Sequence, residues 1–113
     1  FHCRLMRPAA ERMAEALGEV RLAAPTIPVV ANVTAEPLTE VEAIRAALID
    51  QVCGRVRWRE TMAALATDGV DRVVEAGAGK VLAGLAKRGV RGAAVLNLET
   101  ADDVARVAAA LAD

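Results

Sequence analysis

The sequence predicts an α/β fold in which three short parallel strands are covered by helices on both faces. In several segments apolar residues recur every three or four positions, as on the buried side of an amphipathic helix. These segments alternate with short runs rich in β-branched residues, which are typical of buried strands. Because helices separate successive strands, a parallel sheet is the simplest arrangement.

A helix followed by a strand is expected in the first third of the chain. Apolar side chains follow helical spacing over residues 5–17, and Gly18 comes next as a C-terminal cap. The run 27–33 is continuously apolar and rich in Val, so it is expected to form the first strand, beginning at Pro28.

The second helix is expected to follow a loop over residues 34–38. Thr39 and Glu42 have the spacing of a capping box, in which each residue caps the other's main-chain N–H. The apolar stripe then continues to Val52, and Gly54 is expected to follow the end of the helix. The remaining elements are a helix over 58–66, a strand over 72–75, a glycine turn over 77–79, a short helix over 80–89, a strand over 93–98 and a last helix after Thr100 and Asp103.

Length and composition limit the class of protein. A chain of 113 residues suffices for one domain over residues 1–113, and 26 alanines within its 55% of hydrophobic residues predict a core of small side chains. The net charge of −1, without runs of like charge, argues against nucleic-acid or anionic-membrane partners. No bilayer-spanning stretch or signal peptide is visible, and Cys3 and Cys53 are too few for a disulfide framework. A cytoplasmic protein that binds a small molecule or a protein is expected.

The turn at residues 77–80 invites a phosphate-binding interpretation, because it lies between a strand and a helix. A Walker A loop, however, needs glycine at the position of Val74 and Ser or Thr at that of Val81. The pattern GxGxxG fails in the same way at Leu82. A tight turn that lets helix and strand pack closely is the preferred interpretation.

His2 is the only imidazole of the chain, and imidazole can take and return a proton near neutral pH. From composition alone a lone histidine is more often structural, and Cys3 beside it is more simply a small apolar residue. The chain contains no serine, so any serine nucleophile must come from elsewhere. The basic residues Arg55, Arg57 and Arg59 are expected on a solvated face.

Four blocks of the sequence, in order, carry a resemblance to a known family. They are FHCRLM at 1–6, APTIPVVANV at 24–33, Gln51 followed by VRW at 56–58, and EAGAGKVL at 75–82. Together they resemble the C-terminal portion of malonyl-CoA:acyl carrier protein transacylases of bacterial fatty-acid synthesis. The family usually has proline in place of Ala78, which is a departure within a structural turn.

The resemblance implies an α/β-hydrolase-like acyltransferase core that uses a Ser-His ping-pong mechanism. The nucleophile elbow and a ferredoxin-like subdomain would belong to an N-terminal half that this sequence lacks, so the chain alone is expected to be inactive. The substrate would be malonyl-CoA and the partners acyl carrier protein and the N-terminal half, with no bound cofactor or metal. An acyltransferase domain of a polyketide synthase, or a noncatalytic fragment of the same fold, are the alternatives.

The resemblance also implies roles for five residues. His2 would be the general base, and a main-chain carbonyl at Gln51 would orient its ring. A helix ending near residues 51–54 leaves carbonyls without intrahelical partners, which is compatible with that role. Phe1 would favour malonyl over the bulkier methylmalonyl unit. Lys87 and Arg88 would lie where carrier protein or CoA phosphates approach, although positive charge at a helix C-terminus is favoured without any ligand.

Overall fold

The computed structural model describes residues 1–112 and forms two compact units, Phe1–Thr61 and the segment from Met62 onward. The single domain expected from chain length stays a prediction. No helix of the described residues is long and apolar enough to cross a membrane.

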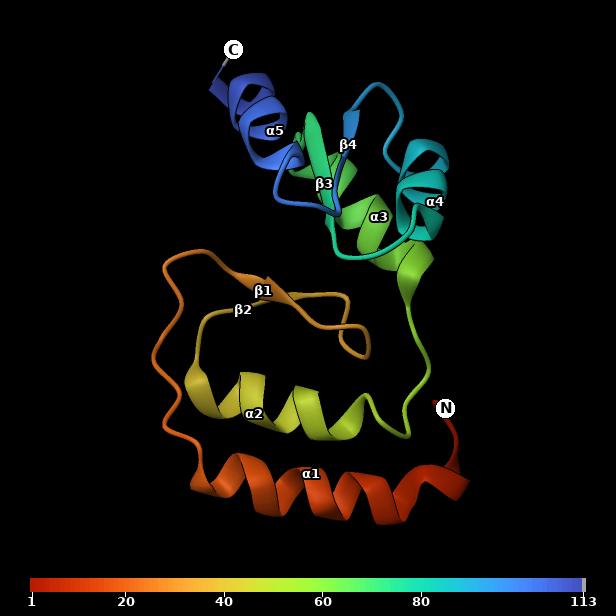
Figure 1. Cartoon of the computed structure of the whole chain (residues 1–113). Helices are drawn as coiled ribbons and strands as arrows, with labels where there is room; N and C mark the ends of the chain where they lie inside the picture. The colour runs from red at the N-terminus through yellow and green to blue at the C-terminus, as the bar shows by residue number, and fades with distance from the viewer. Residues whose placement is uncertain (113) are drawn as a thin grey trace. The chain divides into compact units, whose positions relative to one another are not determined.

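The first unit consists of two packed helices and a two-stranded ribbon (Figure 1). Its elements are the 3-10 turn Arg4–Met6, α1 at Arg7–Glu19, β1 at Val29–Val30, β2 at Pro37–Leu38, α2 at Val41–Asp50 and the beginning of α3, which spans Trp58–Thr67. Arg45 of α2 donates to the main-chain carbonyls of Leu17 and Val20. It thereby supplies donors to carbonyls at the end of α1, where the Leu17 carbonyl also accepts from the main-chain N–H of Val20.

The prediction of three parallel strands is wrong for the first of them. Only Val29–Val30 of the run 27–33 is a strand, and it pairs antiparallel with Pro37–Leu38, in a segment that was expected to be a loop. Between them the main-chain N–H of Ala35 donates to the carbonyl of Ala31 at 3.0 Å, which reverses the chain. So short a connection cannot make a parallel crossover, which needs about a dozen residues.

Two helix ends also differ from the expected ones. Gly18 lies inside α1, whose C-cap is Val20. The N-cap of α2 is Glu40, which makes no side-chain capping bond, so the Thr39–Glu42 capping box does not form. Spacing alone therefore placed both helices but not their ends, because caps depend on local backbone geometry.

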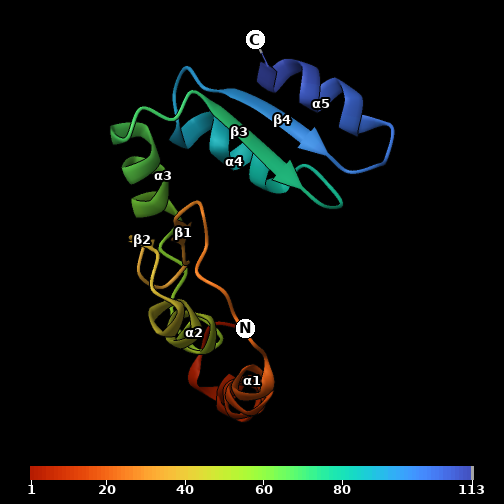
Figure 2. The same ribbon diagram turned by 90° about the vertical axis from the view of Figure 1, so that its left-hand side faces the viewer.

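The second unit is a parallel strand pair with helices on both faces, as expected. β3 at Arg72–Ala76 runs parallel to β4 at Ala94–Leu98, with Val74 opposite Leu96. The connecting helix α4, Val81–Gly89, contacts both strands from one face. Helix α5, Asp103–Ala112, covers the other face (Figures 1 and 2).

The core is built mainly from small side chains, as the alanine content predicted. Among the described residues no bulky side chain is fully buried. The buried apolar residues are Ala31, Ala35, Ala47, Met62, Ala83, Ala86, Val90 and Val107. Several larger apolar side chains are exposed, among them Phe1, Leu5, Ile27 and Val81.

Candidate functional site

The candidate site is built on the C-terminal end of α2. After Asp50 the chain makes a further turn, in which the N–H groups of Gln51 and Gly54 bond back to the carbonyls of Ala47 and Asp50. The carbonyls of residues 51, 52 and 54 are thereby left available for partners outside the helix. All three of them accept from His2.

The main chain of His2 is fixed against this turn. Its N–H donates to the carbonyl of Val52 at 3.1 Å, and its φ of +60° lies in the left-handed region that non-glycine residues rarely adopt. The strained backbone turns the ring toward the helix end. There Nδ1 lies 2.8 Å from the carbonyl oxygen of Gln51 and 3.1 Å from that of Gly54.

These contacts fix which ring nitrogen of His2 carries the proton in the neutral form. A carbonyl oxygen only accepts hydrogen bonds, so Nδ1 must be the N–H donor and Nε2 carries the lone pair. The arrangement has the form of a general base oriented by main-chain carbonyls.

The carbonyl of Gly54 is the part of this arrangement that sequence reasoning missed. From the sequence, one carbonyl near residues 51–54 was expected to accept from the imidazole, with Gln51 as the acceptor, and a second acceptor at Gly54 was not expected. The residue type could not reveal the contact, because every residue carries a carbonyl and only the path of the chain decides where it points.

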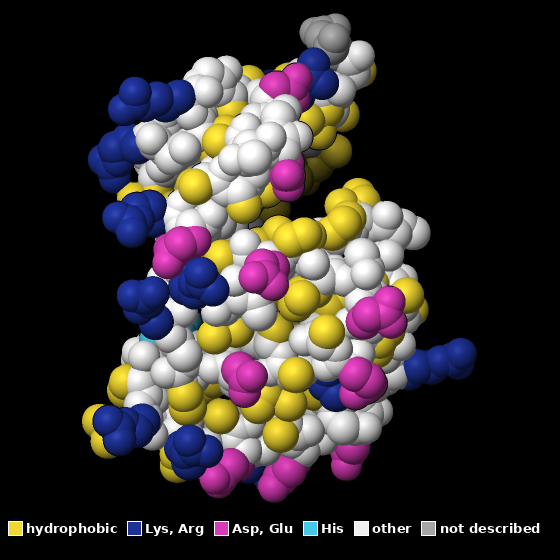
Figure 3. Space-filling model, turned by 180° about the vertical axis from the view of Figure 1, so that it is seen from behind, with side chains coloured by type: hydrophobic (Ala, Val, Ile, Leu, Met, Phe, Trp, Pro, Cys, Tyr) yellow, Lys and Arg dark blue, Asp and Glu magenta, His cyan; other side chains and the backbone are white. Residues whose placement is uncertain are grey.

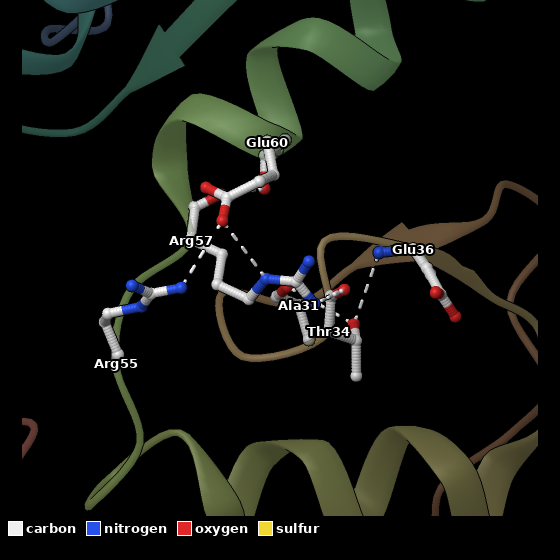
Figure 4. A network of polar contacts seen from close by, with 7 residues as sticks. Ala31, Thr34, Glu36, Arg55, Arg57 and Glu60 are labelled. Carbon is white, nitrogen blue, oxygen red and sulfur yellow. Dashed lines mark hydrogen bonds and ion pairs between the residues drawn. The ribbon is translucent and has the colours of Figure 1, made fainter.

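A polar network supports the loop that packs beside the turn (Figure 4). The guanidinium of Arg57 donates to the carbonyl of Thr34 at 2.8 Å, and its Nε donates to Glu60 at 3.5 Å. The pKa of the Glu60 carboxyl lies below its ordinary value, chiefly because the carboxyl accepts a hydrogen bond from the main-chain N–H of Glu60. A hydrogen bond from Arg57 and the positive charges of Arg55 and Arg57 lower this pKa further. Arg57 is thus half-buried and anchored, whereas it was expected on a solvated face. Arg55 and Arg59 are exposed, as expected.

Phe1 precedes the imidazole with its side chain in solvent, at 94% exposure. Within this chain the ring therefore fills no pocket. Cys3 is exposed as well and is a free thiol, as is the half-buried Cys53. Among residues 1–112 no group of three or more His, Cys, Asp or Glu side chains could hold a metal ion.

The glycine turn is closed by the chain's own side chains. The carboxylate of Glu75 accepts from the main-chain N–H groups of Leu82 and Ala83, at 3.1 and 2.8 Å. Glu99 accepts from the N–H of Gly79, and the amide of Asn97 donates to the Gly79 carbonyl. The N–H groups that a phosphate would need at the start of α4 are therefore already bonded to a carboxylate, and the tight-turn interpretation holds.

Lys87 and Arg88 lie in the last turn of α4, in the second unit. Both are exposed. In Figure 3 lysine and arginine side chains project along the side of this unit on which α4 lies. Their charge agrees with the helix dipole, as expected from the sequence.

Comparison with known proteins finds malonyl transacylases both among the related sequences and among the solved structures. The malonyl CoA-acyl carrier protein transacylase of Salmonella typhimurium is 45% identical over 87 residues, which cover 77% of this chain and 28% of the relative. The crystal structure of the acyl-carrier-protein S-malonyltransferase from Bartonella henselae superposes with a TM-score of 0.91 at 42% identity, covering 100% of this chain and 36% of that one.

A third match is a malonyl-transacylase solved in complex with a type II polyketide acyl-carrier protein. It has a TM-score of 0.80 and 37% identity, and the match covers 99% of this chain and 36% of the solved chain. This chain therefore spans about a third or less of the length of these relatives. No family model matches the sequence.

Proposed function

We propose, on the premise that this chain belongs to the malonyl-CoA:acyl carrier protein transacylase family as a C-terminal portion, that it supplies the general base of a malonyl transfer reaction. The observation that carries the proposal is the double contact of Nδ1 of His2 with the carbonyls of Gln51 and Gly54. This contact leaves Nε2 as the basic atom. Gln51 acts through its main chain, as the acceptor that orients the ring.

In the first half-reaction Nε2 of His2 takes the proton of a serine hydroxyl. The serine oxygen attacks the thioester carbonyl of malonyl-CoA, the carbon–sulfur bond breaks, and the leaving thiolate receives the proton from the imidazolium. The carbonyls of Gln51 and Gly54 keep the ring in place while the proton resides on Nε2. The product is a malonyl ester on serine.

In the second half-reaction the same nitrogen takes the proton of the phosphopantetheine thiol on acyl carrier protein. The thiolate attacks the malonyl ester, and the serine oxygen leaves with the proton. His2 is thus needed twice in each cycle. The chain has no serine. The proposed nucleophile would therefore come from the rest of the polypeptide, and we expect the 113 residues by themselves to be inactive.

The experiment compares His2→Ala with the wild type in the full-length protein that carries this chain, with transfer of labelled malonyl to holo acyl carrier protein as the readout. Loss of the base should lower kcat by about 10²–10⁴-fold. Cys3→Ala, a change at the adjacent exposed residue, is the matched control and should retain activity. Malonylation of the protein at an undiminished rate in His2→Ala would contradict the proposal.

A polyketide-synthase acyltransferase is the second candidate, favoured by the match to a transacylase bound to a polyketide carrier protein. Fold and chemistry are the same in both candidates, so the carrier distinguishes them. Assay of the full-length protein with purified carriers of both pathways, at equal concentration, decides between them by the higher kcat/KM. A cytoplasmic location is part of either proposal.

A further inference from the structure

Gly54 connects three parts of the first unit at one point. Its carbonyl oxygen lies 3.1 Å from Nδ1 of His2, and its N–H donates to the carbonyl of Asp50 at 2.8 Å. Its Cα faces the side chain of Val33, in the loop that follows β1. The position of this one residue therefore determines where the second acceptor of the imidazole lies.

Space, rather than backbone conformation, requires a glycine at residue 54. A Cβ atom built there would lie 2.8 Å from Cγ2 of Val33 and 2.9 Å from the carbonyl oxygen of Asp50. Both distances are shorter than contacts that real Cβ atoms make. Any side chain would therefore force the 51–54 turn, the Val33 loop or the Val33 side chain to move.

The Val33 loop is anchored on both sides of Val33, so it does not yield freely to a side chain at residue 54. The main-chain N–H of Arg57 donates to the carbonyl of Asn32 at 2.8 Å, and its guanidinium donates to that of Thr34 at 2.8 Å. These bonds hold the loop on both sides of Val33. A side chain at residue 54 should therefore change how the turn closes on this loop, and with it the position of the carbonyl that faces His2.

We propose that Gly54 is a positioning residue for His2, whose missing side chain lets the turn close on Val33 and hold a second carbonyl against the imidazole. The inference rests on the proposed function of His2 as general base. With two acceptors the Nδ1–H is held between Gln51 and Gly54, which restricts rotation of the ring. With one acceptor the direction of Nε2 is less well defined.

The variant Gly54→Ala in the full-length protein tests the proposal. We expect kcat for malonyl transfer to fall by about tenfold to a hundredfold, because small misplacements of a catalytic group have effects of this size. KM for malonyl-CoA should stay unchanged. Gly18→Ala is the matched control, since a Cβ there meets nothing within 4 Å.

A second readout follows the ring itself in the 113-residue chain. His2 is its only histidine, so the imidazole ¹⁵N signals need no assignment among several residues. Gly54→Ala should shift the Nδ1 signal, and Gly18→Ala should leave it in place. Unchanged kcat together with an unchanged Nδ1 signal in Gly54→Ala would overturn the proposal.

A measurement on the wild-type chain covers the case in which Gly54→Ala does not fold. Solid-state ¹⁵N–¹³C dipolar recoupling should find the carbonyl carbon of Gly54 within about 4 Å of Nδ1. Absence of this contact would also overturn the proposal. If His2→Ala keeps full activity while the contact is present, the proposed function fails instead, so the two failures are distinguishable.

Discussion

Glu75 of β3 accepts a hydrogen bond from the main-chain N–H of Ala83, in the first turn of α4, at 2.8 Å. The second carboxylate oxygen accepts from the N–H of the preceding residue, Leu82. A carboxylate from the strand thus caps the helix that follows it, across the glycine turn. Two of the N–H groups that have no intrahelical partner are satisfied, and the negative charge lies at the positive end of the helix dipole.

The variant Glu75→Gln should destabilise the second unit. The amide keeps one acceptor but loses the charge and turns an N–H₂ group toward main-chain donors, so the free energy of unfolding should fall by about 1–3 kcal/mol. Urea denaturation followed by circular dichroism measures the change. Glu11→Gln, at an exposed glutamate of α1, is the control and should have little effect. Equal stability of Glu75→Gln and the wild type would show that the cap contributes nothing.

The beginning of α5 should lose stability in acid. The guanidinium of Arg106, together with main-chain and hydroxyl donors at Thr100 and Glu99, holds the pKa of Asp103 well below its usual range. A lowered folded-state pKa stabilises the folded chain above the unfolded value of about 3.9, and this contribution is lost as pH falls toward the folded value.

The variant Asp103→Asn measures this contribution of Asp103. Its free energy of unfolding should lie below that of the wild type at about pH 6, and the difference should shrink as pH falls toward about 2. Urea titrations of both proteins at several pH values follow the difference directly. A difference that is independent of pH would exclude the ionised carboxylate as its source.

Lys87 and Arg88 should contribute to carrier-protein affinity if the end of α4 faces an acidic partner. Changing both to glutamate in the full-length protein should raise KM for acyl carrier protein, most strongly at low ionic strength, where screening is weakest. The control changes Arg21 and Arg59, both exposed, to glutamate and so alters net charge equally. Equal effects of the two double variants, or none, would leave only the helix dipole as the reason for the basic residues.

Phe1 should favour malonyl-CoA over methylmalonyl-CoA. A phenyl ring beside the imidazole would crowd the additional α-methyl group, whereas the hydroxymethyl of a serine would leave room. One methyl group is worth about 1–3 kcal/mol in a pocket, so a preference of about 10- to 200-fold is expected. Competition between the two substrates on the full-length protein, with and without Phe1→Ser, measures it. Equal use of both by the wild type would remove Phe1 as the selector.

The sequence by itself determined the helices and strands of the second unit, and through the family resemblance it identified His2 as the candidate general base. Apolar spacing located α3, α4 and α5, and β-branched runs located β3 and β4, whose parallel pairing follows from the helix between them. These signals are local, because each element buries one face and so repeats apolar residues with its own period. Absence of serine and the presence of a single histidine were likewise readable from composition.

Only the tertiary structure decided the pairing of β1 with β2, the cap that Glu75 provides and the second carbonyl that faces His2. The pairing depends on a chain reversal at Ala35, a non-glycine residue with φ of +55° that gives no sequence signal. The contact between His2 and Gly54 joins main-chain and side-chain groups 52 positions apart. Such contacts depend on how α2, the Val33 loop and the N-terminal segment pack together, because a main-chain carbonyl is common to every residue and only packing selects the one that meets the ring.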